Sequence, residues 1–275
     1  MSSELTDPKA AERAFWSAGN YDAIAELFWE VGAVVAGAVS IAPGMRVLDV
    51  ATGTGSAAIR AAQAGAEVVG LDIAETMFER ARHRAAEAGV EVEWLQGDAE
   101  ALPYEDDGFD RVLTAFGTMF AARHDVAAGE LVRVCRPGGE VVMANWCPDG
   151  FVGRAWAMLR RYRPLEAPEA ATFLEWGTHG HVRRRLGGQL VLAIEPHSVD
   201  LVFASVDDMV DRFAASFPPI VDAKATLEAA EFDALLAELR ALIVELDVGD
   251  GETRIPATYV LVTGHKPVAD LRPNC

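Results

Sequence analysis

The chain has 275 residues, 51% of them hydrophobic and 24% charged, so it is long enough to bury a full α/β core. Its formal net charge of -18 argues against nucleic acid as a partner, because phosphate binding needs a basic surface. The cysteines Cys135, Cys147 and Cys275 include no C-x-x-C pair, which argues against a disulfide framework and against a zinc site.

The N-terminal residues lack the basic start and the apolar core of a signal peptide, and the apolar run 31–42 is too short to span a bilayer. We therefore expect a cytoplasmic protein without a membrane partner. Residues 8–40 are predicted to be helical. Residues 1–44 are therefore predicted to form an N-terminal helical cap. Such apolar helices cover the chain's own site or pack against a second copy, which leaves a homo-oligomer open.

Strands and helices are predicted to alternate through the next hundred residues. The predicted strands are 46–50, 67–72, 90–96, 109–115 and 140–146, and the helices between them are 56–64, 76–88 and 126–135. This spacing is typical of parallel βαβ units and predicts a doubly wound α/β sheet.

The pattern changes after Trp146. Residues 147–188 carry scattered aromatics, prolines and glycines without a clear strand, which predicts a cover insertion over the carboxyl edge of the sheet. A strand within 190–203, helices in 206–247 and a last strand at 258–265 return the chain to its core. The core domain is therefore predicted to comprise 45–146 and 189–275.

A glycine-rich turn follows the first predicted strand and a carboxylate ends the second. The strand holds Asp49, the turn holds Gly53 and Gly55, and Asp72 lies about 20 residues beyond the turn. Glycines let the backbone approach a ligand closely, and a carboxylate at a strand end can accept hydrogen bonds from two ribose hydroxyls. The pattern indicates a nucleotide-type site.

Four ordered stretches carry a family resemblance. They are VLDVATGTG (47–55), VVGLDIAETMFERAR (68–82), GDAEALPYEDDGFDRVLTAFG (97–117) and ELVRVCRPGG (130–139). With them the chain resembles the class I S-adenosylmethionine-dependent methyltransferases, and among these the ubiquinone/menaquinone-biosynthesis type and its small-molecule relatives. The resemblance covers roughly 45–146 and a final strand near 259–266. It implies a Rossmann-like, seven-stranded doubly wound sheet with an antiparallel last strand, N-terminal helices and a helical cover insertion.

The resemblance implies S-adenosyl-L-methionine as the cofactor. It places the Gly53-Thr54-Gly55 backbone against the methionine part and the ribose, and gives Asp72 the two ribose hydroxyls. Further cofactor-binding residues that it implies are Tyr21, Asp49, Ile73, Met77, Asp98, Ala99 and Phe116. Structural alternatives remain for two of them: Asp49 could accept N–H groups of the turn, and Asp98 could cap the segment after it. Ala51 stands where many family members have glycine.

Two residues are candidates for catalysis. His124 follows the fourth strand and could serve as a base, although a polar cap or packing near the cofactor is the favoured explanation. Tyr21 could lie over the cofactor, since a π-face close to a sulfonium is favourable, or could pack an N-terminal helix. His179 and His181 form an i, i+2 pair without a third ligand, so no metal is predicted.

A set rich in aromatic side chains is predicted to bind the acceptor. Its members are Trp16, Met119, Phe120, Trp146, Trp176 and His179. Such a set favours a small, largely apolar or aromatic metabolite, as in secondary metabolism or quinone-like chemistry, although core packing is the plain alternative for each residue alone.

Two other function classes fit parts of the chain. Residues 53–58 match G-x-G-x-x-A, and Asp72 lies where the ribose acid of an NAD(P)-dependent oxidoreductase would be. That interpretation leaves Asp49 and the segment 97–103 unexplained. A non-catalytic cofactor-binding protein on the same fold is the third hypothesis.

Overall fold

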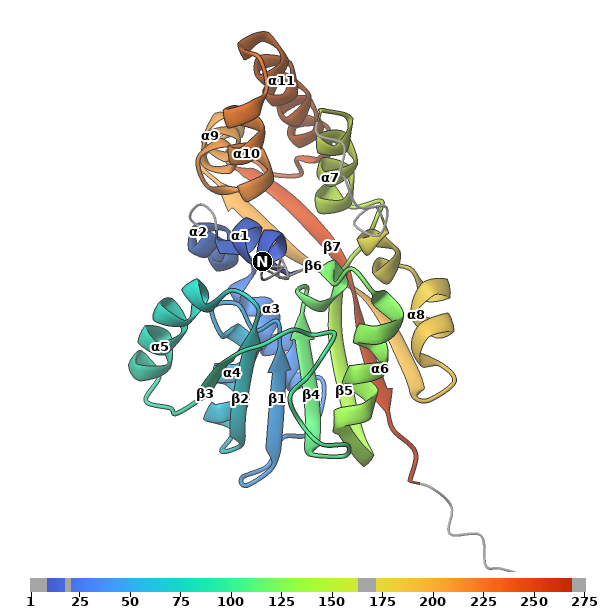
Figure 1. Ribbon diagram of the computed structural model, residues 1–275. Helices are drawn as coiled ribbons and strands as arrows, with labels where there is room; N and C mark the ends of the chain where they lie inside the picture. Colours follow the sequence, from blue (N-terminus) through green and yellow to red (C-terminus); the bar gives the residue numbers. More distant parts are fainter. Residues whose placement is uncertain (1–8, 18–20, 163–171, 269–275) are drawn as a thin grey trace, which may run out of the picture.

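The computed structural model describes residues 9–17, 21–162 and 172–268. Its seven-stranded sheet has the order β3-β2-β1-β4-β5-β7-β6 (Figure 1). The strands are β1 (Arg46–Val50), β2 (Glu67–Asp72), β3 (Glu93–Gln96), β4 (Phe109–Ala115), β5 (Cys135–Trp146), β6 (Val191–Phe203) and β7 (Thr253–His265). β1 to β5 run parallel, and β7 is antiparallel to both of its neighbours. The predicted doubly wound α/β fold with an antiparallel last strand is confirmed.

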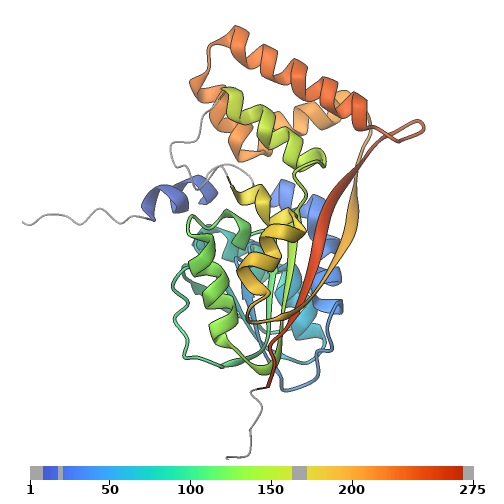
Figure 2. The same cartoon turned by 90° about the vertical axis from the view of Figure 1, so that its right-hand side faces the viewer.

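Helices cover both faces of the parallel half of the sheet (Figure 2). α3 (Trp29–Gly37) and α4 (Ser56–Gln63) pack together on one face, and α6 (His124–Val134) and α8 (His179–Leu186) pack together on the other. A Cβ at Gly32 would lie 2.5 Å from the Ser56 carbonyl carbon, so this glycine lets α3 approach α4. α5 (Phe78–Glu87) follows β2 after the short 3-10 helix η2 (Glu75–Met77). No helix in the described ranges is long and apolar enough to cross a membrane.

The N-terminal helices lie above the ends of the parallel strands. They are α1 (Ala10–Ser17), α2 (Tyr21–Ala25) and the 3-10 helix η1 (Glu26–Phe28), which leads directly into α3. α1 is seen above the upper ends of β1 and β4 in Figure 1. The N-terminal segment therefore approaches the sheet at the edge where parallel α/β folds bind ligands.

β6 and β7 are each 13 residues long and extend beyond the parallel strands. Around their far half gather α7 (Phe151–Tyr162), α9 (Val206–Ser216), α10 (Pro218–Thr226) and α11 (Ala229–Leu246), which we call the helical cover (Figures 1 and 2). Only α7 comes from the predicted insertion 147–188. α9, α10 and α11 come from 206–247, and α8 packs against α6 beside the sheet. The cover thus draws on two separate stretches of the chain.

β5 begins five residues before the predicted strand start. The sequence Pro137-Gly138-Gly139 predicts an interruption, but these residues lie within β5. Cys135 pairs with Phe109 and Glu140 with Arg111, so the extra residues bulge between two paired positions. Backbone hydrogen bonds from Gly138 to Lys266 and from Lys266 to Gly139, 2.7 and 3.0 Å long, hold the bulge.

Lys266, immediately after β7, closes the C-terminal end of α6. Its Nζ donates to the carbonyl oxygens of Val132 and Cys135 at 2.9 and 2.7 Å, and to Asp107 Oδ1 at 2.8 Å. Carbonyls at a helix C-terminus lack intrahelical partners, and a cation there also opposes the negative end of the helix dipole. One side chain therefore ties the last strand to α6.

We predict that Lys266→Met lowers the free energy of unfolding by about 1–2 kcal/mol, because it leaves two carbonyls without their donor. Urea denaturation of the variant would measure the loss. Lys224→Met, at an exposed position of α10, is the matched control. Equal stability of the two variants would show that the Lys266 contacts contribute nothing.

Candidate active site

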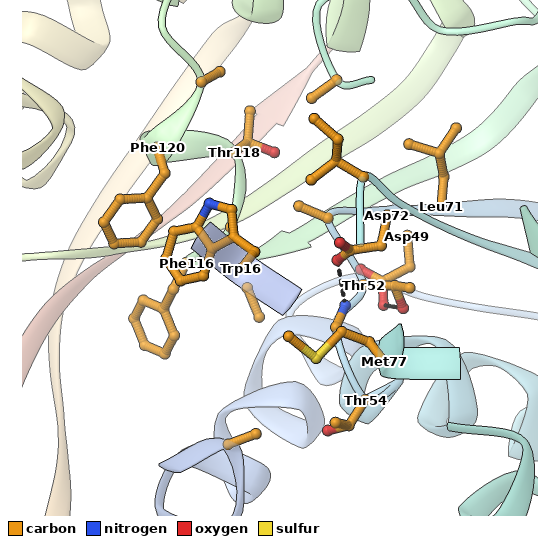
Figure 3. Close-up of a pocket in the computed structure, with 18 of the residues that line it drawn as sticks. Trp16, Asp49, Thr52, Thr54, Leu71, Asp72, Met77, Phe116, Thr118 and Phe120 are labelled. Atoms are coloured by element: carbon orange, nitrogen blue, oxygen red, sulfur yellow. Dashed lines mark hydrogen bonds between the residues drawn. The ribbon is translucent and has the colours of Figure 1, made fainter. Parts of the chain in front are cut away.

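A cavity of about 1030 Å³, partly open to solvent, lies at the carboxyl ends of β1, β2 and β4. The sheet order reverses between β1 and β4, and parallel α/β folds bind ligands where such a reversal occurs. Figure 3 shows side chains from both halves of the sheet and from α1 converging on this space. The predicted cofactor residues that line it are Asp49, Gly53, Thr54, Asp72, Ile73, Met77, Asp98, Ala99 and Phe116.

The turn after β1 brings the backbone to the cavity through unusual conformations. Gly53 and Gly55 have φ values of +55° and +87°, and Ala51 has φ +54°. A non-glycine residue in this region is strained, so Ala51 occupies a conformation that glycine adopts more readily. A Cβ at Gly55 would lie 2.6 Å from the Trp94 ring, which explains the glycine there, although Gly55 itself does not line the cavity.

Asp49 joins the turn to the following helix and keeps one oxygen unpaired. Its Oδ2 accepts hydrogen bonds from Thr52 Oγ1 at 2.6 Å and from the Ala58 N–H at 3.0 Å. Its Oδ1 is buried and has no partner among the described residues. Burial raises the pKa of the Asp49 carboxyl to about 7. A donor or cation in the cavity would satisfy Oδ1 and favour the ionised form.

Asp72 links the end of β2 to the glycine turn. Its Oδ2 accepts from the Gly53 N–H at 2.8 Å, the bond drawn in Figure 3, and its Oδ1 accepts from the Ala74 N–H at 2.9 Å. Each oxygen retains a lone pair for a further donor. Burial raises the pKa of the Asp72 carboxyl, although the backbone N–H groups oppose this effect.

The cavity lining among the described residues carries four carboxylates, on Glu12, Asp49, Asp72 and Asp98, and no basic side chain. Phosphate groups would meet repulsion here, whereas a cationic ligand would be attracted. This charge distribution argues against a dinucleotide and fits a sulfonium cofactor. Asp98 Oδ1 also accepts a hydrogen bond from the Glu100 N–H at 2.9 Å. Asp98 therefore caps the segment that follows it, and this is compatible with a role in ligand binding.

Phe116 and Trp146 separate this cavity from a second one. Their rings stack with centroids 3.6 Å apart at an interplanar angle of 5°. Phe116, directly after β4, has φ +66°, which is a strained conformation. Its ring lies on that of Trp146, the last residue of β5. A Cβ at Gly117 would lie 2.3 Å from the Ala51 Cβ, so two strained turns meet tightly at this point.

The second cavity, also partly open to solvent, has a volume of about 540 Å³ and lies beneath the helical cover. All twelve of its lining residues in the described part of the chain are hydrophobic or aromatic. They come from the N-terminal helices, the segment after β4 with the 3-10 helix η3 (Thr118–Phe120), the end of β5, α7, α9 and Phe217 after α9. Trp16, Phe28, Phe116 and Phe120 line both cavities. The two spaces are therefore neighbours that share an aromatic wall.

The predicted acceptor residues divide into two groups. Trp16 and Phe120 line both cavities and Trp146 lines the second. Met119 and Trp176 are fully buried and line neither cavity, and His179 is an exposed residue at the start of α8. These last three side chains therefore lie away from the spaces in which an acceptor could bind.

His124 lies behind the second cavity, in a buried cluster with Trp176 and His181. Its ring centroid is 5.7 Å from Trp176 and 5.4 Å from His181, whose Nδ1 lies 2.8 Å from Glu175 Oε2. Burial, reinforced by the nearby His181, lowers the pKa of His124 to about 4. His124 lines neither cavity, so its neutral imidazole contacts protein groups in place of an acceptor. Tyr21 begins α2, but its side chain lies outside the described residues.

Several cavity residues escaped the sequence analysis. Glu12 stands one turn before the predicted Trp16 on α1, and Phe213 of α9 stands one turn before Phe217, which directly follows that helix. The i, i+4 spacing shows that each pair shares a helix face, but it does not show what that face covers.

The low pKa of His124 predicts a loss of stability in acid. His124 is neutral in the folded protein and becomes charged on unfolding below about pH 6.5, so its contribution is present above that pH and is lost toward pH 4. When the pH falls from 6.5 to 4.5, we expect the free energy of unfolding of His124→Gln to decrease by about 2 kcal/mol less than that of the unmodified protein. Urea titrations at both pH values test this, and equal losses would show that His124 does not titrate as its burial requires.

Comparisons with known proteins agree with this geometry. Residues 47–139 match the family model of a methyltransferase domain. Over 265 residues the chain is 36% identical to an uncharacterized protein of Mycobacterium tuberculosis, covering 94% of each chain. It is 47% identical over 105 residues to the demethylmenaquinone methyltransferase of Thermus thermophilus, which covers 38% of this chain and 48% of that protein.

Solved structures share the fold. The YcgJ protein of Bacillus subtilis superposes with a TM-score of 0.58 at 22% identity, covering 86% of this chain and 97% of that one. A putative methyltransferase of Bacillus halodurans has a TM-score of 0.57 at 21% identity, with coverages of 86% and 99%. The domain match, the partial similarity to a demethylmenaquinone methyltransferase, the sheet order and the carboxylate-lined glycine turn agree, and the chain belongs to the class I S-adenosylmethionine-dependent methyltransferases.

Proposed function

We propose that this enzyme transfers the methyl group of S-adenosylmethionine to a small, largely apolar or aromatic metabolite that binds in the second cavity. The observation that carries the proposal is the lining of this cavity: its described side chains are all apolar and include Trp146, Trp156, Phe213 and Phe217. Flat aromatic walls favour a ring-bearing ligand, and a lining without polar groups disfavours a sugar or an amino acid.

The cofactor residues would act at the carboxylate-lined end of the first cavity. Asp72 has lone pairs available for two ribose hydroxyls, and Asp98 and the Ala99 N–H would bind the adenine, with Ile73 and Met77 beside the ring. The unpaired Oδ1 of Asp49 would accept from a donor near the glycine turn. Bound here, S-adenosylmethionine supplies a methyl group on a sulfonium that is already activated for displacement.

The chain's own contribution to the reaction would be alignment. The Phe116–Trp146 stack fixes the boundary at which the two cavities meet, and the shared wall of Trp16 and Phe120 excludes water from that point. Holding two reactants in line removes much of the entropic barrier to displacement. The aromatic residue predicted to lie over the cofactor is Tyr21, which we keep as a proposal.

An acceptor atom that carries no proton, or has already lost it, needs no protein base. In the described parts of the chain, no histidine lines either cavity. We therefore assign His124 a structural role, and the proton that a quinol or phenol loses on methylation would pass to solvent or to a carboxylate of the first cavity such as Asp49. The partial similarity to a demethylmenaquinone methyltransferase supports a quinol-like ring among the candidates.

Calorimetry with S-adenosylhomocysteine, with NADH as the control ligand, tests the cofactor assignment. We expect micromolar binding of the first alone. A panel of quinols, phenols and other apolar rings, analysed by mass spectrometry for a gain of one methyl group, then tests the acceptor class. Cofactor binding with methylation only of strongly polar metabolites would overturn the proposed acceptor class.

We predict that Asp72→Ala weakens S-adenosylhomocysteine binding by about 2–3 kcal/mol, because a charge-assisted double hydrogen bond to the ribose is lost. Calorimetry measures the change. Asp250→Ala, in an exposed turn, serves as the matched control and should bind normally. Unchanged affinity in the Asp72 variant would contradict the role given to this carboxylate.

A second variant separates the acceptor cavity from the cofactor cavity. Ala155 on α7 lines only the second one, so Ala155→Leu should fill part of that space. We predict that binding of 1-naphthol, followed by quenching of tryptophan fluorescence, weakens roughly tenfold while S-adenosylhomocysteine binds as before. Ala157→Leu, at an exposed position of the same helix, is the control. If both variants bind 1-naphthol equally well, the second cavity is not its site.

A further inference from the structure

Lys9 joins the start of α1, which contributes a wall of the cofactor cavity, to the segment after β3. Glu12 and Trp16 of α1 line the cavity opposite residues of the sheet. Lys9 stands immediately before this helix, and its carbonyl accepts the Arg13 N–H at 2.9 Å, so Lys9 is rigidly joined to the first turn. Movement of the Lys9 side chain from its partners would therefore release the start of α1.

Lys9 reaches three carboxylates at once. Its Nζ lies 2.8 Å from Glu12 Oε2, 3.1 Å from Glu100 Oε1 and 3.5 Å from Asp98 Oδ1. Glu12 belongs to α1, whereas Asp98 and Glu100 belong to the segment after β3. Since Glu12 and Asp98 both line the cavity, this contact closes the cavity at the end where the adenine would bind.

Glu100 is the fixed end of the contact. Its side chain is 1% exposed, and it also accepts hydrogen bonds from the Arg123 backbone N–H at 2.8 Å and from Arg123 Nε at 2.7 Å. Burial by itself raises the pKa of Glu100, but the hydrogen bonds of Arg123 and Lys9 outweigh it, and the pKa lies below its ordinary value. The carboxylate therefore remains charged near neutral pH and needs both cations.

A second anchor holds the other end of the N-terminal segment. Arg84 of α5 donates to Thr54 Oγ1 at 2.6 Å, pairs with Glu26 of η1 and lies 4.3 Å from the Trp29 ring centroid. These contacts join η1 and α3 to the glycine turn independently of Lys9. Breaking the Lys9 contact would thus loosen the start of α1, which would then depend on the packing of Trp16 against Phe120, while the beginning of α3 stays in place.

We infer that Lys9 is a positioning residue that fastens α1 to Glu100 and thereby controls how fast the cofactor leaves its site. The inference rests on the proposed cofactor site. Because the contact is an ion pair whose Lys9 side chain is partly accessible to solvent, at 16% exposed, salt weakens it in part and accelerates release. A helix held only by apolar packing would show no such salt dependence.

Stopped-flow measurement of S-adenosylhomocysteine dissociation tests the inference. Lys9→Met should raise the dissociation rate roughly tenfold at low salt and remove most of the acceleration that NaCl produces in the unmodified protein. Lys9→Arg should restore a slow, salt-sensitive rate. The melting temperature of the ligand-free protein reports separately on any general loss of stability.

Two control variants make the result specific. Arg123→Met removes the other cation from Glu100 without touching α1, and Lys224→Met removes a lysine from exposed α10. Lys224→Met should leave the dissociation rate within about twofold of the unmodified protein, and Arg123→Met should accelerate release less than Lys9→Met, because Lys9 still joins Glu100 to α1. If Arg123→Met accelerates release as much as Lys9→Met, the effect belongs to Glu100 alone and the role of α1 is refuted.

The two proposals fail in different ways. If the unmodified protein does not bind S-adenosylhomocysteine, the proposed cofactor site fails before any variant is compared. If it binds and Lys9→Met releases the ligand no faster than Lys224→Met, the cofactor site stands and the inference about Lys9 is wrong. A fall in melting temperature with an unchanged dissociation rate also overturns it, because that pattern marks a purely structural contact.

Discussion

The Asp72 carboxylate holds together the part of the molecule on which its chemistry depends. It ends β2, accepts the Gly53 N–H from the turn after β1 and accepts the Ala74 N–H from its own turn. Two neighbouring parallel strands and the glycine turn are thereby fixed relative to each other. Asp49 does the same within the turn, through Thr52 and Ala58. Buried carboxylates are costly unless they are hydrogen-bonded, so the backbone geometry and the binding geometry are set by the same bonds.

The long antiparallel strands β6 and β7 extend this arrangement beyond the parallel half of the sheet. These 13-residue strands reach past the parallel half and carry α9, α10 and α11 to the side where α7 follows β5. The second cavity forms between these helices and the aromatic ends of β4 and β5. The length of β6 and β7 thus allows the second cavity to form directly beside the carboxylate-lined cavity.

The two cavities differ sharply in character although they share a wall. One is lined by four carboxylates and the other by apolar side chains, among the residues that the structure describes. Electrostatic attraction would favour a cationic cofactor in the first cavity, and the cost of desolvating polar groups would favour an apolar acceptor in the second. The N-terminal helix α1 serves both spaces, since Trp16 lines each of them and Glu12 faces the charged one. Its attachment through Lys9 therefore matters to the whole site.

The sequence by itself determined the alternation of strands and helices, the glycine turn and the carboxylates at two strand ends. These features depend on residues within about twenty positions of one another, so spacing and residue type suffice to predict them. Tertiary structure alone decided which aromatic side chains meet. Trp16, Phe120 and Trp146 converge with Phe213 and Phe217 from distant helices, while Met119, Trp176 and His124 turn into the protein interior. The physical reason is that a helix buries whichever face its neighbours cover, and those neighbours are determined by the sheet order and by the long strands β6 and β7.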